Sequence, residues 1–214
     1  MRLYRWLMIT VCAVVGLAAW PAVVGATPMY LVSANTSNLV GAGTFYLDFQ
    51  LNDGGGPVAD NTVNLTAFGF GGGSAAGAPI IFGSASGNVG TGVTLVDSAF
   101  TDFTQAFLPG TAVSFLLGLP TNQVDAPPDL FTLAILDDTF AEIQTFDFYS
   151  SFLSVSFDGV PTISTFASSD PTFTVDAPTV EAVSDLPEPT TLLLVGTALT
   201  GLAARARRRR SSSA

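Results

Sequence analysis

The sequence predicts an all-β fold: an antiparallel β-sandwich, jelly-roll-like in its number of strands, with an N-terminal signal helix and a C-terminal transmembrane helix. Three observations support this prediction. Short stretches of alternating apolar and polar residues recur in the middle of the chain, and each period-two pattern indicates a strand with one buried face. Clusters of Gly, Pro and Asp separate these stretches, and none of them keeps a 3.6-residue period. All 17 Phe lie in this middle part, and a chain of 214 residues is long enough to bury a real core.

Residues 1–26 have the organisation of a secretory signal peptide. A start containing two Arg precedes an uncharged apolar run at 6–19, and the segment ends in a small-residue site for signal peptidase, formed by Val24, Gly25 and Ala26. We expect export through the Sec translocon and cleavage after Ala26. An uncleaved anchor is the alternative, but the apolar run is shorter than the ~20 residues that a spanning helix needs.

The β-sandwich domain is expected over residues 27–176. Its clearest strand is 45–52, where four apolar residues alternate with Tyr46, Asp48, Gln50 and Asn52. Similar patterns predict about nine strands in all, the others at 30–33, 62–67, 89–95, 113–119, 131–135, 153–157, 162–166 and 173–175. Residues 177–186 are acidic and poor in large apolar side chains, which predicts a linker; a last edge strand at 179–183 is the alternative.

The C-terminal end has three parts in a fixed order. A Pro-Glu-Pro tripeptide (Pro187, Glu188 and Pro189) precedes an uncharged, mostly apolar run at 190–204, and a basic tail follows at 205–210, formed by Arg205, Arg207, Arg208, Arg209 and Arg210. As a helix the apolar run is about 22 Å long, so it spans the membrane only with local thinning or snorkelling arginines. The basic tail should stay cytoplasmic, which places the preceding domain outside.

This ending resembles the PEP-CTERM sorting signal of bacteria, because motif, short helix and basic tail occur together and in order. The resemblance implies recognition by an exosortase, a membrane peptidase that cuts near the motif, and an association with exopolysaccharide and biofilm matrix. A simple C-terminal membrane anchor is the alternative. The segment 100–107, the strand 131–136 and the start at 30–33 also resemble a recurring PEP-CTERM family of unknown function, which implies no activity.

The composition excludes several kinds of chemistry. The chain has no His and a single Cys, so it offers no Ser-His-Asp triad, no His-ligated metal and no intrachain disulfide. No Lys or Arg stands between residues 6 and 204, whereas all 17 acidic residues lie between Asp48 and Glu188. The domain is therefore not expected to bind nucleic acid, because nothing in it neutralises phosphate. We expect no metal site, and only non-specific screening of the charge by Ca²⁺.

Candidate sites inside the domain are few. Paired carboxylates could hydrolyse glycosides, and the pairs in question are Asp137 or Asp138 with Glu142, and Asp97 with Asp102. Their spacing along the chain does not place them across a sugar, and we expect no catalytic residue. A carbohydrate-binding module would use aromatic platforms, for which Tyr46 and Tyr149 are the candidates.

The sequence thus predicts an exported, non-enzymatic protein, held transiently at the inner membrane and then placed in the cell envelope or matrix. Its expected role is structural or adhesive, and carbohydrate binding without catalysis is the alternative.

Overall fold

Strands form where most of the period-two patterns lie. The computed structural model describes residues 28–55, 61–119 and 127–183, all within the unit Thr27–Ser184. In β2 (Phe45–Asn52) every second side chain, from Phe45 to Leu51, is fully buried, as the alternation predicts. The opposite face of β2 carries Tyr46, Asp48, Gln50 and Asn52, so this strand separates the core from a polar surface.

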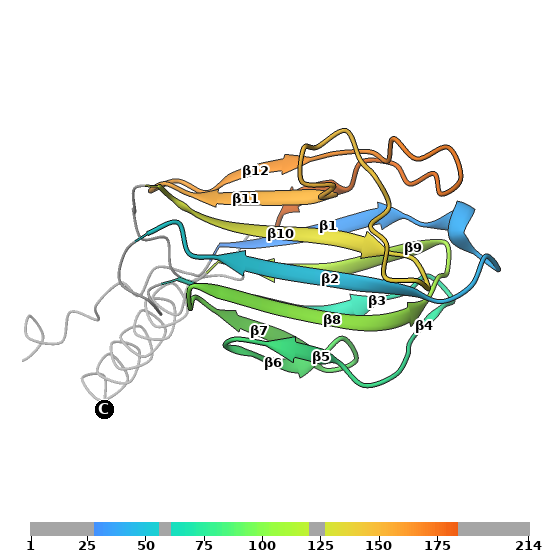
Figure 1. Ribbon diagram of the computed structural model, residues 1–214, viewed down its shortest axis with the longest axis horizontal. Coiled ribbons are helices and arrows are strands. Elements are labelled where there is room, and N and C mark those ends of the chain that lie inside the picture. Colours follow the sequence, from blue (N-terminus) through green and yellow to red (C-terminus); the bar gives the residue numbers. More distant parts are fainter. Residues whose placement is uncertain (1–27, 56–60, 120–126, 184–214) are drawn as a thin grey trace, which may run out of the picture. The chain divides into compact units, whose positions relative to one another are not determined.

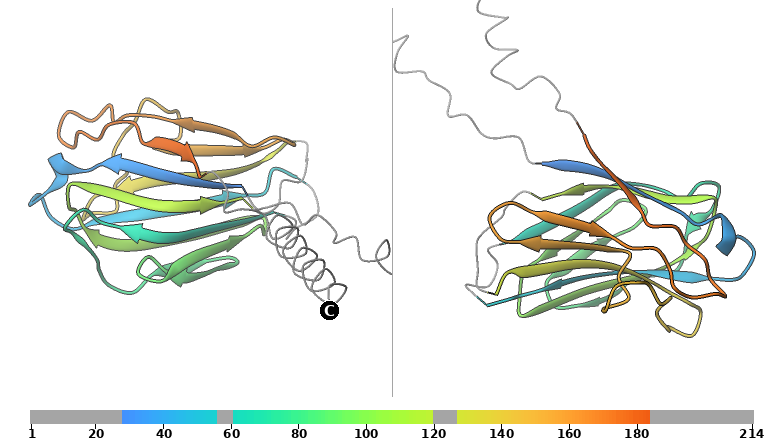
Figure 2. Two further views of the ribbon diagram at one scale, coloured as in Figure 1. Left: turned by 180° about the vertical axis from the view of Figure 1, so that it is seen from behind. Right: turned by 90° about the horizontal axis from the view of Figure 1, so that it is seen from above.

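Two antiparallel sheets pack face to face. The seven-stranded sheet lies in front in Figure 1, and the right-hand view of Figure 2 shows the two sheets as separate layers. The six-stranded sheet has the order β13-β1-β9-β3-β7-β6, and the seven-stranded sheet has the order β12-β11-β10-β2-β8-β4, with β5 also paired to β8. The remaining strands of the described residues are β1 (Met29–Asn35), β3 (Thr62–Gly69), β4 (Ser74–Ala75), β5 (Ile80–Phe82), β6 (Ala85–Asn88), β7 (Gly92–Val96), β8 (Phe100–Leu108), β9 (Ala112–Gly118), β10 (Asp129–Leu136), β11 (Leu153–Phe157), β12 (Thr162–Thr165) and β13 (Thr179–Ala182). The described part of the chain has one helix, the 3-10 turn η1 (Ser37–Leu39). The all-β, antiparallel prediction is confirmed.

Phenylalanine rings fill the space between the sheets. Phe49 of β2 meets Phe115 of β9, in the other sheet, edge to face, with ring centroids 5.7 Å apart. It also lies parallel to Phe131 of β10 at 6.3 Å. Such offset and edge-to-face pairs add to the free energy of burying the ring area. Eight Phe side chains are fully buried: Phe45, Phe49, Phe103, Phe107, Phe115, Phe131, Phe152 and Phe157.

Residues 89–95, expected as one strand, are divided by a turn. The prediction is wrong here because Thr91 N–H donates to the Asn88 carbonyl (3.1 Å), so 85–96 folds into the hairpin β6–β7. At Gly87 φ is +101° and a Cβ would lie 2.1 Å from the Gly92 carbonyl oxygen, so the hairpin needs glycine there. Val89 is nevertheless buried, and its N–H donates to the side-chain oxygen of Gln105 (2.9 Å).

Two further differences concern the end of the domain. Residues 173–175 form no strand, although Val175 is buried and its N–H donates to Ser168 Oγ (2.9 Å). Within the predicted linker 177–186, residues 179–182 instead form β13 and pair with β1, from Tyr30↔Ala182 to Ser33↔Thr179. The alternative interpretation of this segment, a last edge strand at 179–183, is therefore the correct one. Its Thr179 and Glu181 are polar and exposed, and only Val180 of its four side chains is half-buried against the core.

The predicted signal peptide 1–26, the motif 187–189, the helix 190–204 and the basic tail 205–210 lie outside the described residues. Across 28–55, 61–119 and 127–183, the structure contains no helix whose length and hydrophobicity suffice to cross a membrane.

Removing the ring that joins the two sheets should strongly destabilise the domain. We expect Phe49→Ala to lower the free energy of unfolding by about 3–5 kcal/mol, because it leaves a cavity among four neighbouring rings. Phe148→Ala is the matched control, since Phe148 is 90% exposed, and it should stay within about 0.5 kcal/mol of the wild type. Denaturant unfolding measures both free energies. An equal loss of unfolding free energy in Phe49→Ala and Phe148→Ala would contradict the assignment of Phe49 to the core.

Candidate functional site

A groove opens on the outer face of the seven-stranded sheet. Its lining residues come from β2 and β10, which form its floor, and from the segment 137–152 that joins β10 to β11, which forms a wall. The groove has a volume of about 400 Å³, within the range of small-ligand sites. We call it the Tyr149 groove and define it by its lining residues: Gln50, Asn52, Leu130, Thr132, Ala134, Glu142, Tyr149 and Ser151.

A tight turn presents Tyr149 to this groove. The carboxylate of Asp147 accepts hydrogen bonds from Tyr149 N–H (3.3 Å) and from Ser151 Oγ. Ser150 takes a left-handed conformation, φ +54°, which reverses the chain between these two partners. Tyr149 is 64% exposed, and its ring meets the ring of Phe148 edge to face at 5.1 Å. The turn therefore holds two aromatic rings at the surface.

Tyr46 is placed differently from Tyr149. Its ring stacks on the ring of Phe140 with centroids 4.2 Å apart, and it is half-buried. Tyr46 lies at the end of β2 away from Asn52 and does not line the groove. Of the two tyrosines that the sequence singles out, Tyr149 alone is thus brought to the groove.

Sheet register places a row of polar side chains across the floor of the groove. Ser154 of β11 pairs with Thr132 of β10, which pairs with Gln50 of β2, which pairs with Asp102 of β8. Neighbouring members of such a row are about 4.8 Å apart, the distance between adjacent strands. Hydroxyl, amide and carboxyl groups therefore follow one another perpendicular to the strands.

Two carboxyl groups meet at the β8 end of this row. Asp48 is buried, and it accepts hydrogen bonds from Gln50 Nε2 (2.7 Å) and Thr104 Oγ1 (2.8 Å). Burial, followed by the hydrogen bond and the charge of Asp48, raises the pKa of Asp102 from 3.8 to about 7, against a smaller lowering by Thr104. The Asp102 carboxyl therefore loses its proton near neutral pH, well above the range of an exposed Asp.

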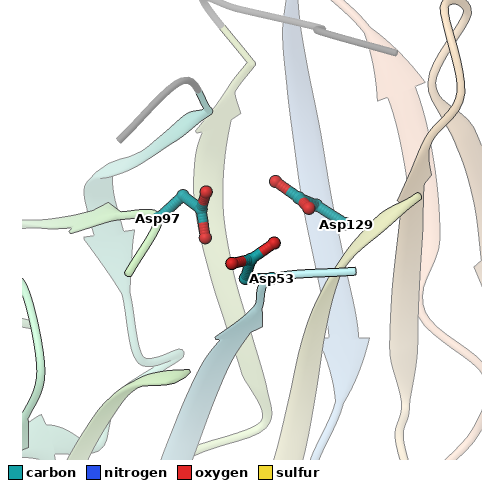
Figure 3. A group of neighbouring side chains, drawn as sticks. All are labelled: Asp53, Asp97 and Asp129. Carbon is teal, nitrogen blue, oxygen red and sulfur yellow. The ribbon is translucent and has the colours of Figure 1, made fainter. Parts of the chain in front are cut away.

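Three other carboxylates converge at one end of the sandwich (Figure 3). Asp53 directly follows β2, Asp97 directly follows β7, and Asp129 begins β10. One oxygen from each lies within 4.8 Å of the others, and Asp97 and Asp129 are each only 1% exposed. We call these residues the acidic cluster.

Hydrogen bonds hold the acidic cluster in place. Asp129 accepts from Gly54 N–H (2.9 Å) and from Asn61 Nδ2 (2.9 Å), and Asp97 N–H donates to the Asn61 carbonyl (3.0 Å). Carboxylate oxygens are the ligands that a hard cation such as Ca²⁺ prefers, so these residues are able to hold one. The sequence predicts no metal ligand here, because the three residues are far apart along the chain. The one feature of the sequence that could have indicated the cluster is that each Asp lies at one end of a strand.

The carboxylates considered for glycoside hydrolysis have different surroundings. Asp97 belongs to the acidic cluster, whereas Asp102 lies on β8 of the seven-stranded sheet and hydrogen-bonds with Asp48. Asp137 caps its own turn, accepting from Thr139 N–H (2.8 Å) and Ala141 N–H (3.0 Å). The hydroxyl of Thr139 contributes most to lowering the pKa of Asp137, so this side chain stays ionised. Glu142 pairs with Leu136 at the base of that turn and lines the Tyr149 groove.

The comparisons with known proteins identify the end of the chain. Residues 185–210 match the PEP-CTERM protein-sorting motif, the segment that carries Pro187, Glu188, Pro189 and the basic tail. No curated protein and no solved structure matches the chain. The chain therefore carries a PEP-CTERM sorting signal, which implies processing by an exosortase and export to the cell envelope or the extracellular side.

Replacing Asp102 should change how stability depends on pH. Its folded pKa lies above the unfolded value, so the proton favours the folded state, and stability falls as the pH rises from about 4 to about 7. Asp102→Asn should remove this decline and raise Tm at pH 8 by about 2–4 °C, a modest shift because solvent screens a half-buried group. Thermal melts from pH 4 to 8 test this. Asp158→Asn, on an exposed turn, is the control. If Tm of Asp102→Asn falls with pH as steeply as Tm of the wild type, the raised pKa of Asp102 is contradicted.

Repulsion within the acidic cluster should also be measurable. No Lys or Arg between residues 6 and 204 offsets it, so Asp53→Asn should raise Tm by a few degrees in low salt. The amide oxygen retains the hydrogen bond from Gly55 N–H to position 53. Adding NaCl or CaCl₂ should raise Tm of the wild type and shrink the difference between the two proteins. A salt-independent Tm in both would mean that cluster repulsion is negligible.

Proposed function

We propose that this protein is a non-enzymatic component of the cell envelope or the extracellular matrix. Signal peptidase removes residues 1–26 after export through the Sec translocon, and the helix 190–204 then holds the domain at the inner membrane. An exosortase cuts near Pro187, Glu188 and Pro189 and so releases the β-sandwich into exopolysaccharide or biofilm. The domain acts there as a structural or adhesive element.

The sorting motif at 185–210 is the observation on which this proposal rests. A non-catalytic role is supported by the composition of the domain, which has neither His nor Lys to activate a nucleophile. It is supported further by the separation of Asp97 from Asp102 and by the capping role of Asp137. A tightly packed Phe core in a domain without Cys suits a protein that must persist outside the cell without disulfides.

Carbohydrate binding without catalysis is the second candidate function. The Tyr149 groove favours it, because an exposed aromatic ring stands beside amide and hydroxyl groups in a concave surface. The two functions are compatible, since a matrix component with such a groove would adhere to the polysaccharide around it.

Intact mass spectrometry of the protein from its native host tests the sorting. We expect a species that begins at Thr27, ends near Pro189 and occurs outside the membrane fraction. Glu188→Ala should leave the protein in the membrane with residues 190–214 attached, because the peptidase no longer recognises the motif. The control Glu181→Ala changes an exposed acid of β13 and should be processed normally. A wild-type species that keeps residues 190–214 in the membrane would mean a permanent anchor.

A further inference from the structure

The Tyr149 groove combines the two kinds of contact that a sugar ring requires. The C–H faces of a pyranose are apolar and stack on an aromatic ring, for which Tyr149 and its neighbour Phe148 are exposed. The ring hydroxyls need partners that both donate and accept, and the groove offers the amides of Gln50 and Asn52 and the hydroxyls of Thr132 and Ser151. The groove thus combines an exposed aromatic ring with hydrogen-bonding side chains in one lining.

The shape of the floor suits a chain rather than a single sugar. The row from Ser154 through Thr132 and Gln50 to Asp102 crosses four strands in register. Hydrogen-bonding groups therefore continue beyond the groove on both sides, at the ~4.8 Å strand spacing. A polysaccharide lying perpendicular to the strands would meet a polar group at each strand.

The negative charge around the groove disfavours acidic polysaccharides as ligands. Glu142 lines the groove, and the Asp48–Asp102 pair lies at the end of the polar row. No Lys or Arg stands anywhere between residues 6 and 204. A uronate, sulfate or phosphate in the groove would meet only like charges, at a cost of about 1 kcal/mol per unit charge at 4 Å even in water and more near the protein. Acidic polysaccharides are accordingly disfavoured.

We propose that the Tyr149 groove binds a neutral polysaccharide chain, with Tyr149 as the stacking platform and Gln50 and Asn52 as the groups that orient its hydroxyls. The inference rests on the carbohydrate-binding function proposed above, to which it adds the class of ligand and the contacting residues. The side chain of Gln50 is oriented by the hydrogen bond that its amide donates to Asp48. Asn52 lies two residues further along β2, on the same face of the strand.

A glycan array tests the inference directly. The full-length chain, purified in detergent and fluorescently labelled, is applied to neutral hexose oligosaccharides and to uronic-acid oligosaccharides printed side by side. We expect binding to neutral oligosaccharides only. Tyr149→Ala and Asn52→Ala should each weaken the binding about tenfold, or about 1.4 kcal/mol, whereas Tyr149→Phe, which keeps the ring, should retain most of it.

Phe146→Ala is the matched control, because Phe146 lies in the same segment, is 76% exposed and does not line the groove. It should bind within twofold of the wild type, and thermal melts confirm that each variant is folded. An equal loss in Phe146→Ala would overturn the assignment to the groove. If the chain binds uronic-acid oligosaccharides and Tyr149→Ala abolishes that binding, the ligand is not neutral, but the carbohydrate-binding function stands. If the chain binds no glycan, both the neutral ligand and the carbohydrate-binding function are overturned. The proposed sorting, which mass spectrometry tests, is unaffected by either result.

Discussion

The absence of positive side chains between residues 6 and 204 is the constraint on which the structure of this domain depends. The domain itself offers no Lys or Arg to its carboxylates, and hydrogen-bond donors within the described residues stabilise several of them instead. Asp129 uses a backbone N–H and an amide, Asp137 caps its own turn, and Asp170 accepts from Thr172 N–H (2.6 Å). Asp102 is half-buried beside Asp48, and its pKa is raised to about 7 by burial and by that neighbour. Acidic residues are thereby concentrated at turns, strand ends and one polar sheet face.

The Phe core offsets the electrostatic cost of this arrangement. Rings from both sheets pack around Phe49, and burial of that apolar area stabilises the fold without an ion pair or a disulfide. The core occupies one face of each sheet, which leaves the outer face of the seven-stranded sheet to carry polar groups. The segment 137–152 then lies over part of that face and turns a flat surface into the Tyr149 groove.

The sorting motif and the proposed carbohydrate site lie in different parts of the chain. The PEP-CTERM motif at 185–210 implies export to the cell envelope or the extracellular side, whereas the Tyr149 groove belongs to the β-sandwich. The domain meets its surroundings through exposed aromatic rings and polar side chains that carry only negative or no charge. A surface of this kind does not attract anionic polymers, and its contacts with neutral ones are less sensitive to ionic strength than contacts between charged groups.

The sequence by itself determined the fold class, the strand faces and the sorting signal, because each depends on local order: period-two alternation in β2, or motif, apolar run and basic tail in succession. It failed at 179–182, where a neighbour distant in sequence decides the outcome: this segment becomes a strand because β1 offers it an edge. It also failed at 89–95, where a local turn that needs glycine at position 87 delays the strand to Gly92. Tertiary structure alone brought Asp53, Asp97 and Asp129 together and placed Tyr149 and Gln50 in the lining of one groove. Sheet order and register place those side chains, and both arise from packing the whole core rather than from any one segment.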